Sequence, residues 1–180
     1  MNLKFQLHNH GFEVHEQAFP ANLLAQLQNE FPPDATEASD LLESSASIRE
    51  AATTGIFHQT AKQILGEGCT PIQAIIYNKS DTAEPWHQAT PATGLILRLS
   101  LDDCTFFDGA LKLCPSSHKH GPLTAQEIRG HSLRPFSSPE MRAGDILILN
   151  PLTIHATAAS TTGKPRRVIH IAYASAHQGN

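Results

Sequence analysis

Residues 95–102 read LILRLSLD, a strict alternation of side-chain types that decides the fold class. Leucines hold the odd positions, and Ile96, Arg98, Ser100 and Asp102 hold the even ones. A period of two residues predicts a β-strand, because successive side chains of a strand point to opposite faces. The leucine face must be buried. The face with Arg98 is either solvated, as is common in antiparallel sheets, or it lines a polar cavity inside a barrel.

Residues 166–173 form a second alternating stretch and predict another strand. One side of it carries Arg166, Val168, His170 and Ala172. The opposite side carries Arg167, Ile169, Ile171 and Tyr173. Three shorter apolar runs, at residues 71–78, 110–114 and 146–149, predict further strands.

The first 67 residues contain the helical signals. A helix is predicted over residues 20–31, where four apolar side chains share one face: Leu23, Leu24, Leu27 and Phe31. A second helix is predicted over residues 56–65, with Gly66 as its end signal. Between them, residues 34–47 are acidic and serine-rich and predict a mobile loop. Leading helices followed by many short strands indicate a mainly β, α+β protein: a sandwich or barrel with helices packed outside.

The composition excludes several kinds of partner. The chain has 180 residues, which suits one domain, and its 13 basic and 17 acidic residues give a net charge of −4. This balance offers no electrostatic attraction for nucleic acid or an anionic membrane. No apolar run approaches the length of a membrane span, and the N-terminus lacks the apolar core of a signal peptide. We therefore expect a cytoplasmic protein whose partner is a small molecule.

Cysteine and histidine differ in what they indicate. The three cysteines, Cys69, Cys104 and Cys114, have no paired spacing, and we expect small buried apolar side chains. The chain contains 11 histidines. Because imidazole is the commonest metal ligand and a near-neutral acid or base, this number suggests a metal site.

Three motifs follow one another along the chain. The first is PWHQA at residues 85–89, and the second is DGALKLCPSSHKHG at residues 108–121. The third begins with AGDILILNP at residues 143–151, continues to His155 and ends at Arg166, eleven residues later. Three ordered motifs are far more specific than any one of them alone.

Together these motifs resemble the phytanoyl-CoA dioxygenase family of iron(II)- and 2-oxoglutarate-dependent oxygenases, over residues 71–173. The resemblance implies a double-stranded β-helix, or jelly roll, with a metal site at its open end. Within a single domain of residues 1–180, residues 68–175 would form the jelly roll and residues 1–67 would pack against it. The implied activity is that of an oxidoreductase, a dioxygenase that hydroxylates or otherwise oxidises a C–H bond of a small molecule. Its cofactors would be Fe(II) and 2-oxoglutarate.

The resemblance also implies a role for individual residues. His87 and His155 would be the iron ligands, two members of a facial triad that leaves positions open for the co-substrate and dioxygen. Arg166 would bind the far carboxylate of 2-oxoglutarate, because a planar guanidinium matches carboxylate geometry. Thr157 matches a position where the family often has a hydroxyl that holds the same carboxylate. Arg98 would face the site and contact the co-substrate or an acidic substrate.

The sequence departs from the family at position 89, where Ala89 replaces the aspartate that completes the triad. Three explanations remain open. In the first, iron binds and water or a nearby carboxylate, Glu84 or Asp81, fills the gap. In the second, chloride fills it, because the family's 2-oxoglutarate-dependent halogenases have Ala or Gly at this position. In the third, the chain is a non-catalytic relative that binds a small acid, since two neutral histidines hold a metal weakly.

Other conspicuous residues have structural interpretations. His118 and His120 fall in a turn after a strand, and we expect them to be structural or solvated. Trp86 is expected to pack rather than to stack on a substrate. Residues 34–47 and 89–94 are expected to be the loops that select the substrate.

Overall fold

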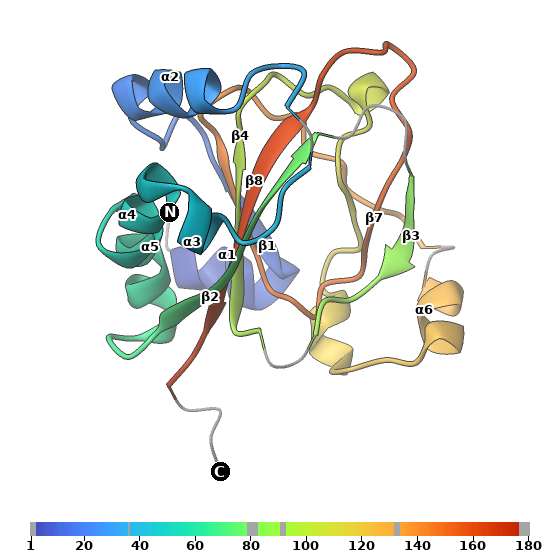
Figure 1. Cartoon of the computed structure of the whole chain (residues 1–180). Coiled ribbons are helices and arrows are strands. Elements are labelled where there is room, and N and C mark those ends of the chain that lie inside the picture. Colours follow the sequence, from blue (N-terminus) through green and yellow to red (C-terminus); the bar gives the residue numbers. More distant parts are fainter. Residues whose placement is uncertain (1–2, 36, 79–82, 91–92, 132–133, 177–180) are drawn as a thin grey trace.

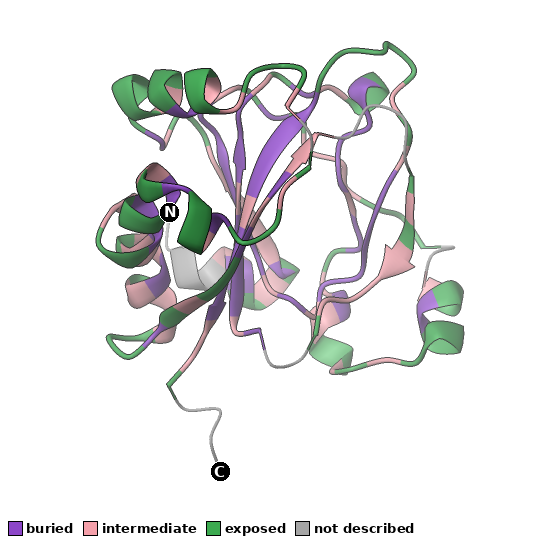
Figure 2. Ribbon diagram, viewed as in Figure 1, coloured by how far each residue is buried: buried purple, intermediate pink, exposed green. Residues whose placement is uncertain are grey.

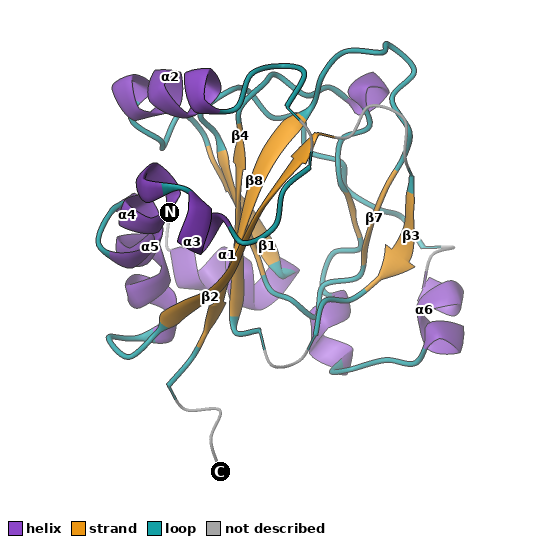
Figure 3. Cartoon of the chain, in the orientation of Figure 1, coloured by secondary structure: helices purple, strands orange, loops and turns teal. Residues whose placement is uncertain are grey.

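The computed structural model describes residues 3–35, 37–78, 83–90, 93–131 and 134–176 of the chain. Helices and two antiparallel sheets make up this part (Figures 1 and 3). The helices are α1 (Leu3–His10), α2 (Ala21–Glu30), α3 (Leu41–Ser44), α4 (Ala46–Thr53), α5 (Ile56–Leu65) and α6 (Ala125–His131), with the 3-10 turns η1 (Phe106–Asp108) and η2 (Ser117–His120). The strands are β1 (Phe12–His15), β2 (Thr70–Asn78), β3 (Glu84–His87), β4 (Leu95–Ser100), β5 (Lys112–Leu113), β6 (Ile146–Leu149), β7 (His155–Thr157) and β8 (Arg167–Ala174).

The two sheets form the layers of a jelly roll. The larger sheet has the strand order β1-β6-β4-β8-β2, and the smaller sheet has the order β3-β7-β5. All of their strand pairs are antiparallel. Figure 1 shows helices α2 to α5 along the left side of the larger sheet and the smaller sheet on its right.

The main hydrophobic core lies between these helices and the larger sheet (Figure 2). The leucine face of β4 is buried there, as its alternation predicts. Phe57 of α5 and Ile48 of α4 are fully buried against the sheet. Tyr173 of β8 is also buried, and its hydroxyl donates a hydrogen bond to the Ala52 carbonyl at 2.8 Å. The helices thus seal one face of the sheet, and its other face is directed toward the smaller sheet.

Most predicted elements are present. The helix expected over residues 56–65 is α5, and Gly66 follows it with φ of 94°, a backbone conformation that suits glycine. The helix expected over residues 20–31 is α2, but only Leu27 is fully buried, and Leu23 is 39% exposed. The strands expected at 71–78, 95–102, 146–149 and 166–173 correspond to β2, β4, β6 and β8. The run at 110–114 forms a strand, β5, over only two residues.

The mobile loop predicted over residues 34–47 is wrong for its second half, which contains α3 and the start of α4. Leu41 and Ile48 are buried in the core, and they anchor this segment against β2. The Ser45 side chain accepts a hydrogen bond from the Ile48 backbone N–H, so a serine read as a loop residue is a helix N-cap. The burial of these two apolar side chains stabilises helical structure in a segment whose polar composition predicts a loop.

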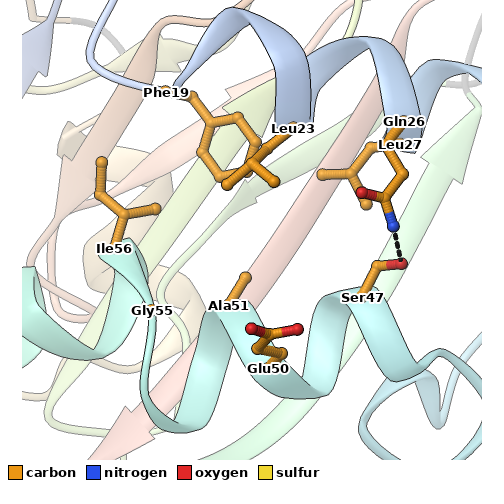
Figure 4. A pocket seen from close by; sticks show the side chains of 9 residues that line it. All are labelled: Phe19, Leu23, Gln26, Leu27, Ser47, Glu50, Ala51, Gly55 and Ile56. Atoms are coloured by element: carbon orange, nitrogen blue, oxygen red, sulfur yellow. Dashed lines mark hydrogen bonds between the residues drawn. The ribbon is translucent and has the colours of Figure 1, made fainter.

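A cavity of about 100 Å³ opens between α2 and the α4–α5 pair (Figure 4). Its lining is mostly apolar, and Gln26 donates a hydrogen bond to Ser47 across its mouth at 2.9 Å. None of the residues that the motifs single out lines it. None of the helices in the described ranges is both long and apolar enough to cross a bilayer.

Candidate metal and co-substrate site

The inner face of the larger sheet carries polar side chains beside apolar ones. Residues directly opposite each other in antiparallel strands share a face, and Arg98 of β4 lies opposite His170 of β8. Ser100 lies opposite Val168 in the same register. Arg98 and Ser100 line a cavity inside the jelly roll, so the second of the two placements considered for this face is correct.

His87 and His155 lie side by side at the edge of this interior. They are directly opposite each other in the β3–β7 pairing, and their ring centroids are 4.2 Å apart with the planes inclined at 54°. His155 is only 4% exposed, and His87 is half-buried. The structure therefore brings together the two histidines that the first and third motifs provide.

Hydrogen bonds fix the orientation of both imidazoles. His87 Nδ1 lies 2.7 Å from the Pro85 carbonyl oxygen, and His155 Nδ1 lies 2.8 Å from the Thr153 carbonyl oxygen. A carbonyl oxygen only accepts, so each Nδ1 donates the hydrogen bond, and in the neutral form of such a ring Nε2 keeps its lone pair. Metal-binding histidines commonly have this arrangement, because the outer hydrogen bond fixes the tautomer and the ring orientation.

Burial keeps His155 neutral. The pKa of His155 is lowered to about 3, mainly by burial and to a smaller extent by the neighbouring His87, whereas the Thr153 hydrogen bond opposes the shift. An imidazole with this pKa is unprotonated at neutral pH, which is the form that binds a metal.

Two arginines line one small cavity of about 30 Å³ inside the jelly roll. Arg166 is 5% exposed, and its Nη1 donates a hydrogen bond to the Gly109 carbonyl oxygen. Burial lowers the pKa of Arg98; Tyr77 opposes this shift and the charge of Arg166 adds to it. Two guanidinium groups that share a cavity attract an anion between them, and their planar forks suit a carboxylate.

Thr157 lies on the same face of β7 as His155, two residues further along, and is 5% exposed. Its Oγ1 accepts a hydrogen bond from the Glu84 backbone N–H at 3.0 Å. The hydroxyl proton of Thr157 is then directed elsewhere, which suits a hydroxyl that donates to a bound carboxylate.

His170 lies opposite Arg98 on the inner face of the larger sheet, and the sequence motifs do not single it out. Its Nδ1 is buried and has no hydrogen-bond partner among the described residues. Its ring meets the Tyr77 ring edge-on at a centroid distance of 5.9 Å. Burial lowers the pKa of His170 to about 3, with smaller contributions from Arg98 and His155. The alternation of residues 166–173 was the available signal, since it puts His170 on the face of Arg166.

The structure shows where Ala89 lies, the residue that stands in place of the motif's aspartate. Ala89 follows β3, its backbone N–H donates to the Pro151 carbonyl at 2.9 Å, and it packs half-buried against the apolar cluster between the sheets. Within the described ranges, no group of three or more His, Cys, Asp or Glu side chains could hold a metal ion. Glu84 is described and Asp81 lies outside the described residues. The site thus offers two nitrogen donors and an anion cavity.

The contacts of the remaining residues are those expected of structural side chains. His118 Nε2 lies 3.0 Å from the His8 carbonyl oxygen, a contact between η2 and α1, and His120 is exposed on η2. Trp86 packs edge-on against Phe136, with ring centroids 5.9 Å apart. All three cysteines are buried and unpaired, as predicted.

The donor set fits a divalent cation together with a dicarboxylate. The two Nε2 lone pairs would hold the cation, and the arginine cavity would take a carboxylate. A family model described as phytanoyl-CoA dioxygenase (PhyH) matches residues 28–168 of the chain. The chain belongs to the phytanoyl-CoA dioxygenase (PhyH) family.

A curated protein is similar in sequence as well. An iron/alpha-ketoglutarate-dependent dioxygenase, ausO of Aspergillus calidoustus, is 31% identical over 147 residues, which cover 71% of this chain and 49% of that protein. The PhyH chain thus spans about half the length of this curated relative.

Solved structures establish the fold. The non-heme alpha-ketoglutarate-dependent epimerase SnoN, from nogalamycin biosynthesis, superposes with a TM-score of 0.82 at 19% identity and covers 97% of this chain and 82% of its own. EctD from S. alaskensis, solved with 2-oxoglutarate and 5-hydroxyectoine, has a TM-score of 0.81 at 18% identity, covering 97% of this chain and 76% of its own. The jelly roll implied by the motifs is confirmed.

Proposed function

We propose that this PhyH chain is an Fe(II)- and 2-oxoglutarate-dependent dioxygenase that oxidises a C–H bond of a small organic molecule. The observation that carries the proposal is the pair of imidazoles at 4.2 Å, both with Nδ1 bonded to a carbonyl, beside a cavity lined by two arginines. Family membership supports the same reading.

Different residues would bind the metal and the co-substrate. His87 and His155 would hold Fe(II) through Nε2. When bound, iron with 2-oxoglutarate and dioxygen supplies the oxidising power for the reaction. Arg166 and Arg98 would bind the far carboxylate of the co-substrate from two sides, and the Thr157 hydroxyl would donate to it. The jelly-roll walls around them would exclude water from the reacting centre.

The decisive experiment is an anaerobic titration of the protein with Fe(II) and 2-oxoglutarate, followed by visible absorption. We expect a metal-to-ligand charge-transfer band, and on admission of oxygen we expect succinate and CO2 in equal amounts. The His155→Ala variant should show no band. If the wild-type protein shows no band, the enzymatic proposal fails and the non-catalytic alternative is left; 2-oxoglutarate would then raise the Tm without turnover.

Ala89 favours a second candidate, a halogenase that uses the same two histidines. A methyl group in place of a carboxylate leaves room for a halide beside the metal. The same titration with and without chloride separates the two candidates, because only a halide-binding site changes the band with chloride. Replacing Ala89 with Asp should abolish any such dependence.

A further inference from the structure

Loss of the aspartate creates a deficit of negative charge at the proposed iron site. Two neutral imidazoles do not offset the charge of Fe(II), and Arg98 and Arg166 add two further positive charges against the two of 2-oxoglutarate. An uncompensated charge inside a protein is costly, so a site of this composition favours another anionic group within reach.

A β-bulge turns a carboxylate toward this site. In the β3–β7 pairing, Glu84 lies opposite Thr157 and His87 lies opposite His155. Three steps on β3 therefore match two steps on β7, which is the register shift of a bulge. In a regular strand, residues three apart point to opposite faces. The bulge restores Glu84 to the face that it shares with Thr157, and hence with His87 and His155.

Two contacts support this placement of Glu84. Its backbone N–H is bonded to Thr157 Oγ1 at 3.0 Å, which holds the bulged strand against β7. Its carboxylate interacts electrostatically with Arg98, a residue of the inner face. Glu84 is half-buried, so its charge is only partly screened by water.

We propose that Glu84 is the compensating carboxylate of the two-histidine site, acting on the metal through space from across the bulge. Direct ligation is not invoked, because the described residues hold no three-membered ligand group. Glu84 would thus act through its charge and not as a ligand, and the inference rests on the proposed function. In this inference the ligand position that Ala89 leaves open is not filled by Glu84, which supplies only the missing negative charge.

The test is a cycle of four proteins: wild type, Glu84→Gln, Ala89→Asp and the double variant. Each is titrated anaerobically with Fe(II) at saturating 2-oxoglutarate, and the Kd is measured by calorimetry. We expect Glu84→Gln to weaken Fe(II) binding about tenfold, the loss found for outer partners of metal ligands. In the Ala89→Asp background the added carboxylate supplies the missing negative charge. Glu84→Gln should then raise the Kd for Fe(II) by less than about threefold.

Two further variants control for charge and fold. Glu84→Asp keeps the charge and should restore most of the affinity. Glu30→Gln makes the same chemical change at an exposed position on α2 and should have no effect. An equal loss in both backgrounds would assign Glu84 a merely structural role and overturn the inference. If the wild type binds Fe(II) and Glu84→Gln binds it equally well, only this inference fails; if the wild type does not bind, the proposed function fails with it.

Discussion

The two faces of the five-stranded sheet differ in kind, although the same strands supply both. The face toward the helices carries leucines, isoleucines and Tyr173, all buried in one apolar cluster. The face toward the smaller sheet carries Arg98, Ser100 and His170 among apolar neighbours. The apolar side chains of the helical face gain stability from burial, and the charge of Arg167 on this face is paired with Asp102. The inner face instead keeps charges and an unpaired imidazole nitrogen inside the protein, which is costly unless a ligand uses them.

The largest expected effect tests the helical face. Leu97→Ala removes a fully buried side chain between β4 and the helices, and we expect it to lower the free energy of unfolding by about 2–5 kcal/mol. Urea denaturation measures this change. On the inner face, Ser100→Ala should cost less than about 1 kcal/mol. Comparable losses from both variants would show that the two faces do not differ in the way described.

Arg166 and Arg167 are adjacent in the sequence, and their side chains point to opposite faces of the five-stranded sheet. Substituting each in turn therefore tests the comparison of the two faces. Arg167 forms a bidentate pair with Asp102, at 2.5 and 2.9 Å, and also donates to the Phe31 carbonyl at the end of α2. Arg166 lines the inner cavity. Arg167→Met should lower the free energy of unfolding by roughly 2–4 kcal/mol, since it leaves the Asp102 carboxylate without its guanidinium partner and with only the Arg167 backbone N–H. Arg166→Met should weaken 2-oxoglutarate binding about 100-fold.

Each arginine variant should change one of the two measured properties, stability or the Kd for 2-oxoglutarate, and leave the other nearly unchanged. Urea denaturation of Arg166→Met should show a far smaller loss than that of Arg167→Met, and the Kd of Arg167→Met for 2-oxoglutarate should stay near that of the wild type. If Arg167→Met loses the co-substrate while remaining folded, the roles of the two residues have been assigned the wrong way round.

The sequence predicts most of the fold where one pattern spans a whole element. The helix over residues 56–65 and the strand over residues 146–149 have their predicted bounds. β3 and β7 have no such pattern, since they are four and three residues long and β3 contains a proline. The motifs nevertheless identify the histidines within them, because the type and order of the residues carry that information even where the strand itself is not predicted.

The sequence does not predict features that depend on pairing. The bulge of β3 arises only when three of its residues are matched to two of β7, so the face of Glu84 cannot be derived from β3 alone. His170 is placed on the face of Arg166 by alternation, but its position beside Arg98 requires the register between β4 and β8. The same limit applies to α3 and α4, whose buried Leu41 and Ile48 stand within a polar stretch.

The smallest expected effect concerns pH and the buried imidazole of the inner face. The folded-state pKa of His170 is about 3, below the usual value near 6.5, so between these pH values only the unfolded chain takes up its proton. Wild-type stability therefore falls as the pH drops through this window. The groups facing His170 are Arg98 from β4, Tyr77 from β2 and His155 from β7.

Replacing His170 with leucine removes this proton linkage. We expect the slope of unfolding free energy against pH to decrease by up to about 1.4 kcal/mol per pH unit between pH 4 and 6, with His155 still contributing its own share. Glutamine at the same position is polar but does not titrate, so it should reduce the slope equally even though its absolute stability differs from that of the leucine variant. A slope unchanged in both variants would mean that His170 accepts a proton in the folded state, and the inner face would then be wetter than its burial indicates.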